Sequence, residues 1–460
     1  MSISIASLKK RFHNYLSNPA RVIVTSFALL ILAGALLLML PISSRSGISL
    51  PLLDALFTAT SASCVTGLVV RDTFTAFSLF GQVVLLLLIQ LGGLGLVTFA
   101  TFFNLALRKR IGLKNLYVAQ ESVGSDRMSE MARLTRTIFL VTFAFEGAGA
   151  LLLMLTFVPK YGSYGVFISI FLAVSSYCNA GFDPLGFEKP FTSLSNYTDQ
   201  PMVLIPVMLL IICGGLGFIV WQELFYFRKN RKLSFHTRIV LIFSGALVLL
   251  GALLFGLLEW SNPDTLGGMP GWEKILNSFF LSVSSRTAGF NTVPIEELTG
   301  TTKLLHLFWM FIGAAPGSTG GGVKVTTVFV LLMTVVSVMS GKEDTIVGKH
   351  RVEKSAVYKA MAVVSAAFLV VAVSTACIFF TSHQGGATFS EIDALFESVS
   401  AFGTVGISVG VTGIANTATR MFLILTMFIG RVGPGAMALS LAMRPERKKT
   451  VLPEARIMVG

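Results

Sequence analysis

One pattern of eleven residues occurs four times in this chain, and it limits the possible folds more than any other feature. Each copy begins with Phe, continues with mostly small residues and reaches Gly ten positions later. The copies span residues 57–67, 171–181, 279–289 and 396–406. Each lies between two long apolar segments, so four equivalent loops can be arranged around one axis. That arrangement is typical of an ion-selective pore.

The composition indicates a protein that crosses a membrane several times. Hydrophobic residues make up 53% of the 460 residues and charged residues only 13%, whereas a soluble domain carries about 25% charged residues. The four cysteines at positions 64, 178, 213 and 377 are far apart and have no CxxC spacing. Neither a disulfide framework nor a zinc site is therefore expected. We interpret Cys64 and Cys178, each three residues before a repeated Gly, as small space-filling residues.

The apolar segments form four units with one plan: a span, a short apolar segment, the Gly loop and a second span. The short segments at 53–63, 167–177, 273–284 and 390–400 cannot cross a bilayer, and we predict that they are re-entrant helices. Two full spans return the chain to the side where it began, so the units are parallel. We predict an all-α membrane protein with eight transmembrane helices and four re-entrant pore helices around a pseudo-fourfold central pore.

This plan divides the chain into units joined by short loops. The predicted order is an N-terminal segment at 1–20, unit 1 at 21–106, a loop at 107–134, unit 2 at 135–226, a loop at 227–237, unit 3 at 238–338, a loop at 339–356, unit 4 at 357–443 and a tail at 444–460. The second spans carry glycine clusters at 92–95, 214–217, 313–317 and 430–435. Bends or close helix contacts are expected there.

The distribution of Lys and Arg predicts the orientation. Of the 36 basic residues, 26 fall on the side of both termini and eight on the opposite side, while Lys324 and Arg431 fall within the membrane. Cytoplasmic loops carry such an excess. We therefore predict a multi-pass membrane protein with cytoplasmic termini and outward-facing Gly loops. The net charge of +13 then reflects orientation and contact with anionic lipid, and not binding to nucleic acid.

The four Gly loops have the properties of a cation filter. The short helices point their C-termini, which carry partial negative charge, at one cavity. No ring of acidic side chains is present, so backbone carbonyls must select the ion, as they do for K⁺. Glycine permits the backbone angles that aim carbonyls at one axis. The predicted filter residues are Cys64, Val65, Thr66, Gly67, Cys178, Asn179, Ala180, Gly181, Arg286, Thr287, Ala288, Gly289, Gly403, Thr404, Val405 and Gly406.

K⁺ is expected at the backbone of the last Gly in each loop. Only one strict Gly per loop is present, and the four loops are not identical. Both features predict a looser filter than one built from four identical loops with two glycines each.

The second span of unit 3 contains a segment that disfavours a continuous helix. Residues 313–322 hold five glycines and one proline, which cost about 1 and about 3 kcal/mol each in a helix interior. Irregular backbone at this depth must be buried in protein or line a cavity. We expect it just below the filter as a gate and as the main break among the second spans. The predicted gate residues are Gly313, Ala314, Ala315, Pro316, Gly317, Ser318, Thr319, Gly320, Lys324 and Arg431.

We make a separate prediction for each of four charged residues near the predicted pore. A central Arg costs about 2.5–3.5 kcal/mol on insertion scales, so Arg431 must face the interior, where it can meet the carbonyls of the 313–322 loop. It would raise the barrier to K⁺, or alternatively act only as a structural cap. Lys324 is expected to snorkel toward the cytoplasmic side. Glu397 is expected to bind filter backbone N–H groups. Arg286 is expected to reach a carboxylate or filter carbonyls.

These features together resemble the Trk/Ktr/HKT superfamily of K⁺ transporters, and within it the bacterial Ktr-type membrane subunit, over essentially the whole chain. The resemblance is carried by the four units, by Ser-Arg-Thr-Ala-Gly-Phe-Asn at 285–291, by Gly-Ser-Thr-Gly-Gly-Gly at 317–322 and by Arg431. It implies that 313–322 is an intramembrane gating loop. The filter glycines that it implies are Gly67, Gly181, Gly289 and Gly406.

The resemblance also implies a location in the bacterial plasma membrane, and it implies partners. A homodimer is expected, with the partly apolar tail at 451–460 packed at its interface, although a disordered tail is the alternative. A cytosolic RCK-type ring that binds nucleotides is expected to contact the basic loops. A Gly in the first filter loop is expected to favour K⁺ over Na⁺.

The sequence therefore predicts the pore-forming subunit of a bacterial K⁺ uptake system and not an enzyme, with stimulation by Na⁺ left open. K⁺ is the transported ion, and no covalently bound cofactor is expected. The chain has no Walker A motif and no GxGxxG after a strand, so nucleotide control must come from another chain. The alternative is a secondary solute symporter, but such folds usually show inverted repeats. A signalling or scaffold protein would explain none of the repeats.

Overall fold

The computed structural model describes residues 19–95, 98, 101, 131–384 and 389–441. Almost all of the predicted N-terminal segment, most of the loop at 107–134 and the whole tail at 444–460, with its predicted dimer contact, lie outside the described residues. Helices form nearly all of the regular structure that is described, and a two-stranded hairpin is the exception.

The helices follow the predicted order of four units, and one short helix precedes each Gly loop. Unit 1 contains α2 (Pro19–Met39), η1 (Pro41–Ser43), α3 (Leu52–Ser63), α4 (Thr73–Ala76) and α5 (Leu79–Leu94). Unit 2 contains α8 (Met131–Tyr161), α9 (Ser163–Tyr177), η3 (Ser195–Tyr197), α10 (Pro201–Gly215) and α11 (Phe218–Asn230).

Units 3 and 4 repeat this order. Unit 3 contains α12 (Phe235–Glu259), the π-helical turn η4 (Pro263–Gly267), α13 (Gly271–Ser284), α14 (Gly300–Phe311) and α15 (Val325–Met339). The strands β1 (Ile346–Val347) and β2 (His350–Arg351) pair antiparallel before unit 4. Unit 4 contains α16 (Lys354–Gln384), α17 (Glu391–Gly403), α18 (Val411–Ile414), α19 (Thr417–Val432) and α20 (Pro434–Leu441).

The first span of each unit is long and apolar enough to cross a membrane. The four such segments are Ala20–Met39, Arg133–Tyr161, Phe235–Glu259 and Lys354–Thr381. Helices α10 and α11 together qualify as one bent span, and α5 and α15 are apolar but shorter. The structure therefore supports a helical multi-pass protein, while the full count of eight spans stays a prediction.

The second spans are interrupted in more than one unit, so the expectation of one main break is wrong. Helix α10 ends at Gly215, and α11 leaves it at an angle of 98°. Glycines with positive φ mark the corresponding positions: Gly217 (91°), Gly95 at the end of α5 (80°) and Gly433 at the end of α19 (90°). Glycine adopts this conformation without a steric penalty. The interruption in unit 3, between α14 and α15, is the longest of those described.

The first glycine of the cluster in units 1, 2 and 4 allows the second span to touch the short helix. A Cβ added at any of these glycines would collide with a backbone carbonyl in the last turn of the short helix of the same unit. The colliding pairs are Gly92 with Ser63, Gly214 with Tyr177 and Gly430 with Phe402. The predicted close helix contact at the glycine clusters is therefore confirmed for these three units.

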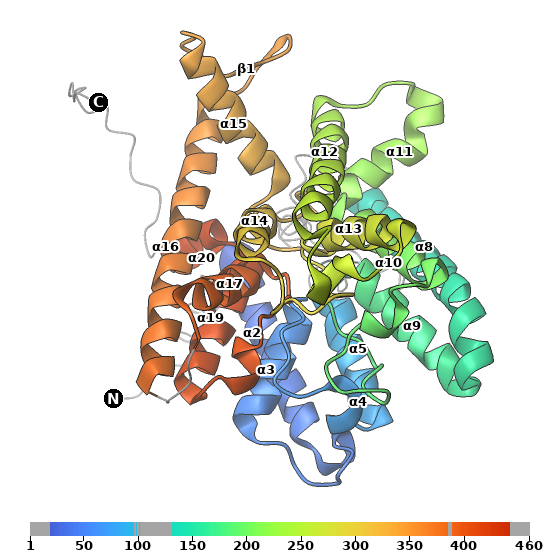
Figure 1. The fold of residues 1–460 in the computed structure, drawn as a ribbon. Coiled ribbons are helices and arrows are strands. Elements are labelled where there is room, and N and C mark those ends of the chain that lie inside the picture. The colour runs from blue at the N-terminus through green and yellow to red at the C-terminus, as the bar shows by residue number, and fades with distance from the viewer. Residues whose placement is uncertain (1–18, 96–97, 99–100, 102–130, 385–388, 442–460) are drawn as a thin grey trace, which may run out of the picture.

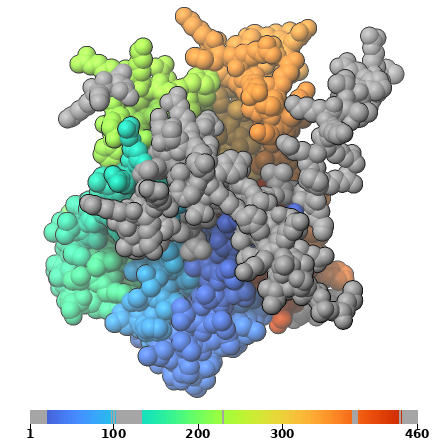
Figure 2. All heavy atoms as spheres, turned by 180° about the vertical axis from the view of Figure 1, so that it is seen from behind, coloured from blue at the N-terminus to red at the C-terminus, as the bar shows by residue number. Residues whose placement is uncertain are grey.

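Contacts between units close a ring (Figure 1). The second span of each unit packs against the short helix of the next unit, with α5 on α9, α10 on α13, α14 on α17, and α19 back on α3. Seen from behind in Figure 2, unit 1 in blue lies beside unit 2 in green. Asp54 on α3 reinforces the closure, because it accepts hydrogen bonds from Arg71 Nε at 2.8 Å and from Arg420 Nη1 of α19 at 2.7 Å.

The substitution Gly214→Ala should destabilise the protein, because the added methyl group must displace the Tyr177 carbonyl. Overpacking of this kind costs about 1–3 kcal/mol. The midpoint of thermal unfolding of the purified protein is the measurement. Gly147→Ala on α8 is the matched control, since a Cβ at position 147 meets no atom within 4 Å. Equal midpoints for the two variants would contradict the packing role of Gly214.

Candidate functional site

The four repeated glycines meet at one place, and each lies against the loop of the next unit. A Cβ built on each glycine would approach the carbonyl oxygen of the residue that precedes the next glycine in the ring. The approaches are Gly67 to Ala180 at 2.7 Å, Gly181 to Ala288 at 2.7 Å, Gly289 to Val405 at 2.6 Å and Gly406 to Thr66. The order runs through units 1, 2, 3 and 4 and returns to unit 1. A side chain at any of these positions would therefore break a closed ring of backbone.

The four loops share an unusual backbone conformation. The repeated glycines have φ values of 94°, 69°, 83° and 89°, in chain order. The residue two positions before each glycine also has positive φ: Val65 (50°), Asn179 (57°), Thr287 (66°) and Thr404 (50°). Residues with a Cβ rarely adopt this region, and each costs about 1–3 kcal/mol. A left-handed residue at every second position turns successive carbonyls toward the same side, which a cation filter requires.

Serine side chains support the loops in three units, and the sequence analysis missed them. Ser61 and Ser400 each accept a hydrogen bond, at 3.1 Å, from the amide N–H of the repeated Gly in their own loop. Ser175 accepts one from the amide of Phe182 at 3.0 Å. Each serine stands six residues before its Gly, which is a signal that the sequence contained. Unit 3 has Val283 at this position.

A cavity of about 600 Å³ opens directly onto the ring, and we call it the vestibule. All four repeated glycines line it. Its charged lining residues are Asp72, Asp183, Lys189 and Glu296. The predicted filter loops therefore have no acidic ring, but the cavity that opens onto them carries carboxylates that were not predicted from the sequence.

Asp183 lies closest in sequence to the ring, two residues after Gly181. Burial raises the pKa of its carboxyl to about 7. A hydrogen bond from the amide of Leu185, at 3.0 Å, opposes this rise in pKa, while the nearby Asp72 adds to it. Asp183 is therefore half protonated near neutral pH.

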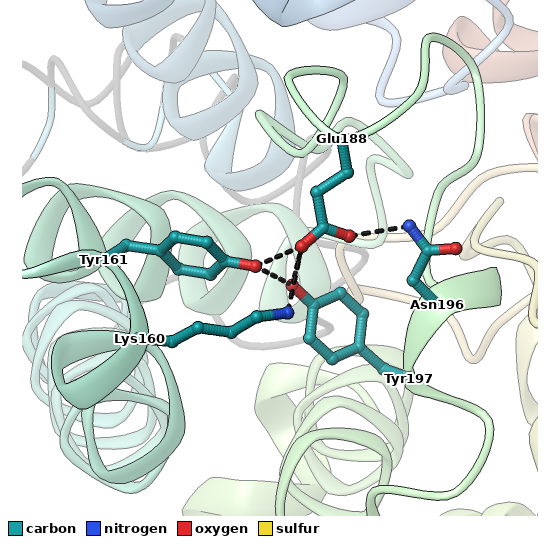
Figure 3. Close-up of polar contacts among 5 residues, drawn as sticks. All are labelled: Lys160, Tyr161, Glu188, Asn196 and Tyr197. Atoms are coloured by element: carbon teal, nitrogen blue, oxygen red, sulfur yellow. Dashed lines mark hydrogen bonds and ion pairs between the residues drawn. The ribbon is translucent and has the colours of Figure 1, made fainter.

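A polar cluster holds the unit 2 wall of the vestibule (Figure 3). The carboxylate of Glu188 accepts hydrogen bonds from Tyr161 Oη, from Lys160 Nζ at 3.0 Å and from Asn196 Nδ2 at 2.6 Å. The hydroxyl groups of Tyr161 and Tyr197 are 2.9 Å apart. The cluster joins the end of α8 to η3 and to the loop between α9 and η3, and residues 189–193 of that loop line the vestibule.

The loop at 313–322 lies against two of the filter loops. The amide of Gly321 donates to Thr404 Oγ1 at 3.1 Å, and a Cβ on Gly320 would collide with Thr287 Oγ1. Thr319 Oγ1 donates to the carbonyl of Tyr177, at the end of α9, at 3.0 Å. The irregular backbone therefore packs directly on the filter.

The loop at 313–322 exchanges backbone hydrogen bonds with the break between α10 and α11. Ala315 N–H donates to the Gly215 carbonyl at 3.0 Å, and Thr319 N–H donates to the Gly214 carbonyl at 3.3 Å. In return, Phe218 N–H donates to the Gly317 carbonyl at 2.8 Å. Backbone groups that leave the helical pattern at this depth need partners of this kind.

Arg431 binds three carbonyls from two different units. Its Nη1 donates to Thr319 O of the loop, as the sequence analysis expected. Its Nη2 donates to Gly92 O and, at 3.0 Å, to Gly93 O in the last turn of α5. These carbonyls have no partner within α5 because the helix ends there. Arg431 therefore caps α5 in unit 1 and holds the loop of unit 3 at the same time.

Lys324 bonds back to the loop, while the expectation for Arg286 is wrong. The Nζ of Lys324 donates to the Gly320 carbonyl at 2.7 Å, and Lys324 lines a cavity of about 200 Å³ together with Arg431. Its extension toward the cytoplasmic side stays a prediction. Arg286 reaches neither a carboxylate nor a filter carbonyl within the described residues. Its Nη1 and Nη2 lie 3.3 Å from the carbonyl and the hydroxyl oxygen of Ser244, respectively.

Glu397 binds backbone N–H groups, as expected, but they belong to the segment after the fourth filter loop and not to the predicted filter residues. Its carboxylate accepts hydrogen bonds from the amides of Thr412 at 3.0 Å and Val409 at 3.4 Å, and from Ser408 Oγ at 2.8 Å. All three groups belong to the segment that follows the fourth filter loop. Glu397 therefore holds that segment and does not face the ring.

Glu146, a buried carboxyl on α8, was not predicted from the sequence. Gln90 Nε2 of α5 donates to it at 3.3 Å, and the thiol of Cys178 lies 3.9 Å from it. Cys178 in turn packs against Gly93, whose carbonyl Arg431 binds. The signal was a single acidic residue in the middle of a long apolar span, a feature that marks functional sites in membranes.

Comparison with known proteins gives a consistent result over nearly the whole chain. The family model described as "TrkH: Cation transport protein" matches residues 4–450. The chain is 38% identical to "Ktr system potassium uptake protein B" of Bacillus subtilis, covering 96% of this chain and 97% of that protein. It is 36% identical to "Potassium/sodium uptake protein NtpJ" of Enterococcus hirae, covering 98% and 99%.

A solved structure has a similar fold. It is the crystal structure of the potassium transporter TrkH from Vibrio parahaemolyticus, with a TM-score of 0.71 at 19% sequence identity. The match covers 92% of this chain and 84% of the other. At this identity the match supports the fold alone.

The substitution Ser400→Ala should broaden cation selectivity, because the amide of Gly406 loses its partner. An unsatisfied buried donor costs about 1–3 kcal/mol, and the fourth loop can then relax. Uptake of Rb⁺ into proteoliposomes, with Na⁺ as competitor, is the measurement. Ser398→Ala is the control, because Ser398 binds only a carbonyl of its own helix. Unchanged competition by Na⁺ in a folded Ser400→Ala protein would exclude this role.

Proposed function

This chain belongs to the TrkH family of cation transport proteins, and we propose that it is the pore-forming membrane subunit of a bacterial K⁺ uptake system. It is a transport protein and not an enzyme. The observation that carries the proposal is the closed ring of four glycine loops, each in contact with the carbonyl of the next. The names of the relatives from B. subtilis and E. hirae, both potassium uptake proteins, support K⁺ as the ion.

In the proposed mechanism, K⁺ enters from the vestibule and loses water as it reaches the ring. The backbone carbonyls of the filter loops replace the lost hydration shell, and K⁺ gives up its weakly held water more readily than a smaller cation does. The partial negative charge at the C-termini of α3, α9, α13 and α17 stabilises the ion there. The proposed ion positions are the backbones of Gly67, Gly181, Gly289 and Gly406.

We propose that the loop at 313–322 and Arg431 form the gate. The loop packs on the third and fourth filter loops, and Arg431 holds it against the end of α5. The ionisable side chains that line the cavity beyond the loop, Lys324 and Arg431, are both basic, and the positive charge of Arg431 opposes the passage of a cation. Opening then requires that the loop and its hydrogen bonds to Arg431 move aside.

Partners and orientation complete the proposal. We propose that both termini lie in the cytoplasm and that the vestibule opens to the outside, because the distribution of Lys and Arg favours this orientation. A homodimer and a cytosolic RCK-type nucleotide-binding ring are proposed from the resemblance of the sequence. The name of the E. hirae relative includes sodium, which supports testing Na⁺ both as a stimulating ion and as a permeating ion.

The test is growth of a bacterium that lacks its own K⁺ uptake systems. Expression of this chain with an RCK-type partner should restore growth at low external K⁺ and uptake of Rb⁺. Failure of a well-expressed, correctly assembled protein to move K⁺ or Rb⁺ would contradict the proposed function.

The substitution Arg431→Ala should raise K⁺ flux, because it removes both the bond to the loop and a positive charge from the conduction path. A deletion within 314–320 should act in the same direction. The measurement is initial Rb⁺ uptake in proteoliposomes per folded protein. Arg420→Ala is a control, because Arg420 lies on the same helix but binds Asp54 far from the loop. A flux at or below that of the parent protein in both gate variants would exclude the gate.

Uptake of K⁺ should fall as the external pH is lowered through about 7. Asp183 is charged above its pKa of about 7 and neutral below it, so acid removes a negative charge that concentrates cations in the vestibule. Asp183→Asn should lower the uptake at pH 8 and remove this step from the pH profile. Rb⁺ uptake between pH 5.5 and 8.5 is the measurement, and a persistent step near pH 7 in the variant would assign the titration to another group.

A further inference from the structure

A groove lies at the junction of units 2 and 3, on the outside of the ring. It is a cavity of about 310 Å³ between α10 and α12, and we call it the junction groove. The lining is apolar apart from Ser244 and Arg286. Leu209 of α10 and Leu249 of α12, on either side, are 53% and 63% exposed. On a chain of this composition, such a surface faces lipid.

A cation without an anionic partner lies at the base of the junction groove. The guanidinium of Arg286 contacts only the two oxygens of Ser244, each at 3.3 Å. Its Nε is buried and has no hydrogen-bond partner, and no carboxylate lies within ion-pair distance in the described part of the chain. A charge in apolar surroundings is costly unless a counter-charge compensates it. The groove therefore offers a strong site for an anion.

The junction groove continues along α12 as a path for an apolar chain. A second cavity of about 260 Å³ shares Leu249 with it and extends past Leu253 and Leu257 to Trp260. The distance from Ser244 to Leu257 is about 20 Å at the rise of an α-helix. One acyl chain spans about half of the hydrocarbon core of a bilayer, which is ~15 Å. The two cavities together are therefore long enough to hold an acyl chain.

We propose that the junction groove binds a long-chain fatty acid, with its carboxylate on Arg286 and its acyl chain along α12. The depth of Arg286 favours a fatty acid over a phospholipid. Ser244 lies about 14 Å along α12 from its first residue, Phe235, and Arg238 near that end marks the membrane surface. A carboxylate can be carried to this depth, whereas a bulky phosphate headgroup remains at the surface.

The junction groove also touches the proposed gate. Ala314, in the first turn of the 313–322 loop, lines it, and so does Gly215, whose carbonyl accepts the hydrogen bond of Ala315. A bound fatty acid therefore contacts both the loop and the break that supports it. This coupling to transport rests on the proposed function, whereas the binding site itself does not.

Photolabelling of the purified full-length protein in lipid nanodiscs tests the site. The probe is a palmitate analogue with a photoactivatable diazirine, and the labelled peptides are mapped by mass spectrometry. In the parent protein, labels should concentrate on α10 and α12. Gly245→Phe should reduce them about tenfold, because Gly245 lines the junction groove and a Cβ there meets no atom within 4 Å. Gly147→Phe on α8 is the control, since position 147 is equally open.

Probes with and without a carboxylate distinguish a fatty acid from other possible ligands of the junction groove. The methyl ester of the same probe should label the groove about tenfold less than the acid, because it cannot pair with Arg286. Equal labelling by acid and ester would overturn the proposal in favour of ordinary lipid contact. Displacement of the probe by phosphatidylglycerol but not by palmitate would assign the groove to a phospholipid. Protection of the groove by a second copy of the chain would assign it to a protein interface.

Flux measurements separate the site from the proposed function. Added palmitate should change Rb⁺ uptake by the parent protein and by Gly147→Phe, but not by Gly245→Phe. Normal labelling with unchanged uptake would overturn the coupling to the loop alone. Normal labelling in a protein that moves no K⁺ or Rb⁺ would overturn the proposed function and leave the fatty-acid site supported.

Discussion

Every backbone group that leaves the helical pattern inside this protein must find a partner inside the protein, and this requirement organises the whole structure. The filter loops meet it through serines on their own short helices, such as Ser61 and Ser400. The loop at 313–322 meets it by exchanging hydrogen bonds with the break between α10 and α11. In a low-dielectric interior, each missing partner would cost several kcal/mol. The irregular segments are therefore as specific in their packing as the helices.

Unit 3 lacks two features that support the filter loop in the other units, and its 313–322 loop lies close to the same place. It has Val283 where the others have a supporting serine. Its second span does not place a glycine against the end of its own short helix, because Gly313 packs on Gly321 within the loop. The loop instead approaches Thr287 from below. The third filter loop thus contacts the 313–322 loop directly, in addition to the hydrogen bonds that it makes with Ser284 of its own unit and with Asn179 of unit 2. A movement of the proposed gate would therefore reach the filter loop through Thr287.

The features that follow from repetition could be predicted from the sequence, while those that depend on a three-dimensional neighbour could not. Four Phe-to-Gly copies at one spacing were enough to predict the short helices and the position of the glycines. The positive φ of Val65 and Thr287 could not be predicted, because these residue types disfavour it and only the closed ring imposes it. Arg286 was misjudged because nothing in the sequence indicates that α12 supplies its partner. The serine six residues before each Gly was visible in three copies and was overlooked.

The glycine clusters of the second spans are another feature that the sequence predicts only in part. A cluster of glycines permits either a close helix contact or a bend, and the sequence does not distinguish them. The structure uses both within one cluster: Gly214 packs on the Tyr177 carbonyl, and three residues later Gly217 turns the chain. The close contact places the second span against the short helix, and the turn then leaves the last carbonyls of α10 without helical partners. Those carbonyls are the ones that the 313–322 loop binds.

Arg431 shows why a structural cap and an electrostatic barrier are not competing explanations. The carbonyls that it binds at Gly92 and Gly93 lie at the C-terminus of α5, which carries partial negative charge. This partial charge holds the guanidinium in place and also offsets part of its positive charge. A bare Arg at this depth would be expelled or would need a carboxylate. The three carbonyl bonds hold the guanidinium at this depth, and no carboxylate pairs with it among the residues that the structure describes. In the proposed gate, the cap is therefore what would make the barrier possible, and loosening the last turn of α5 would weaken both together.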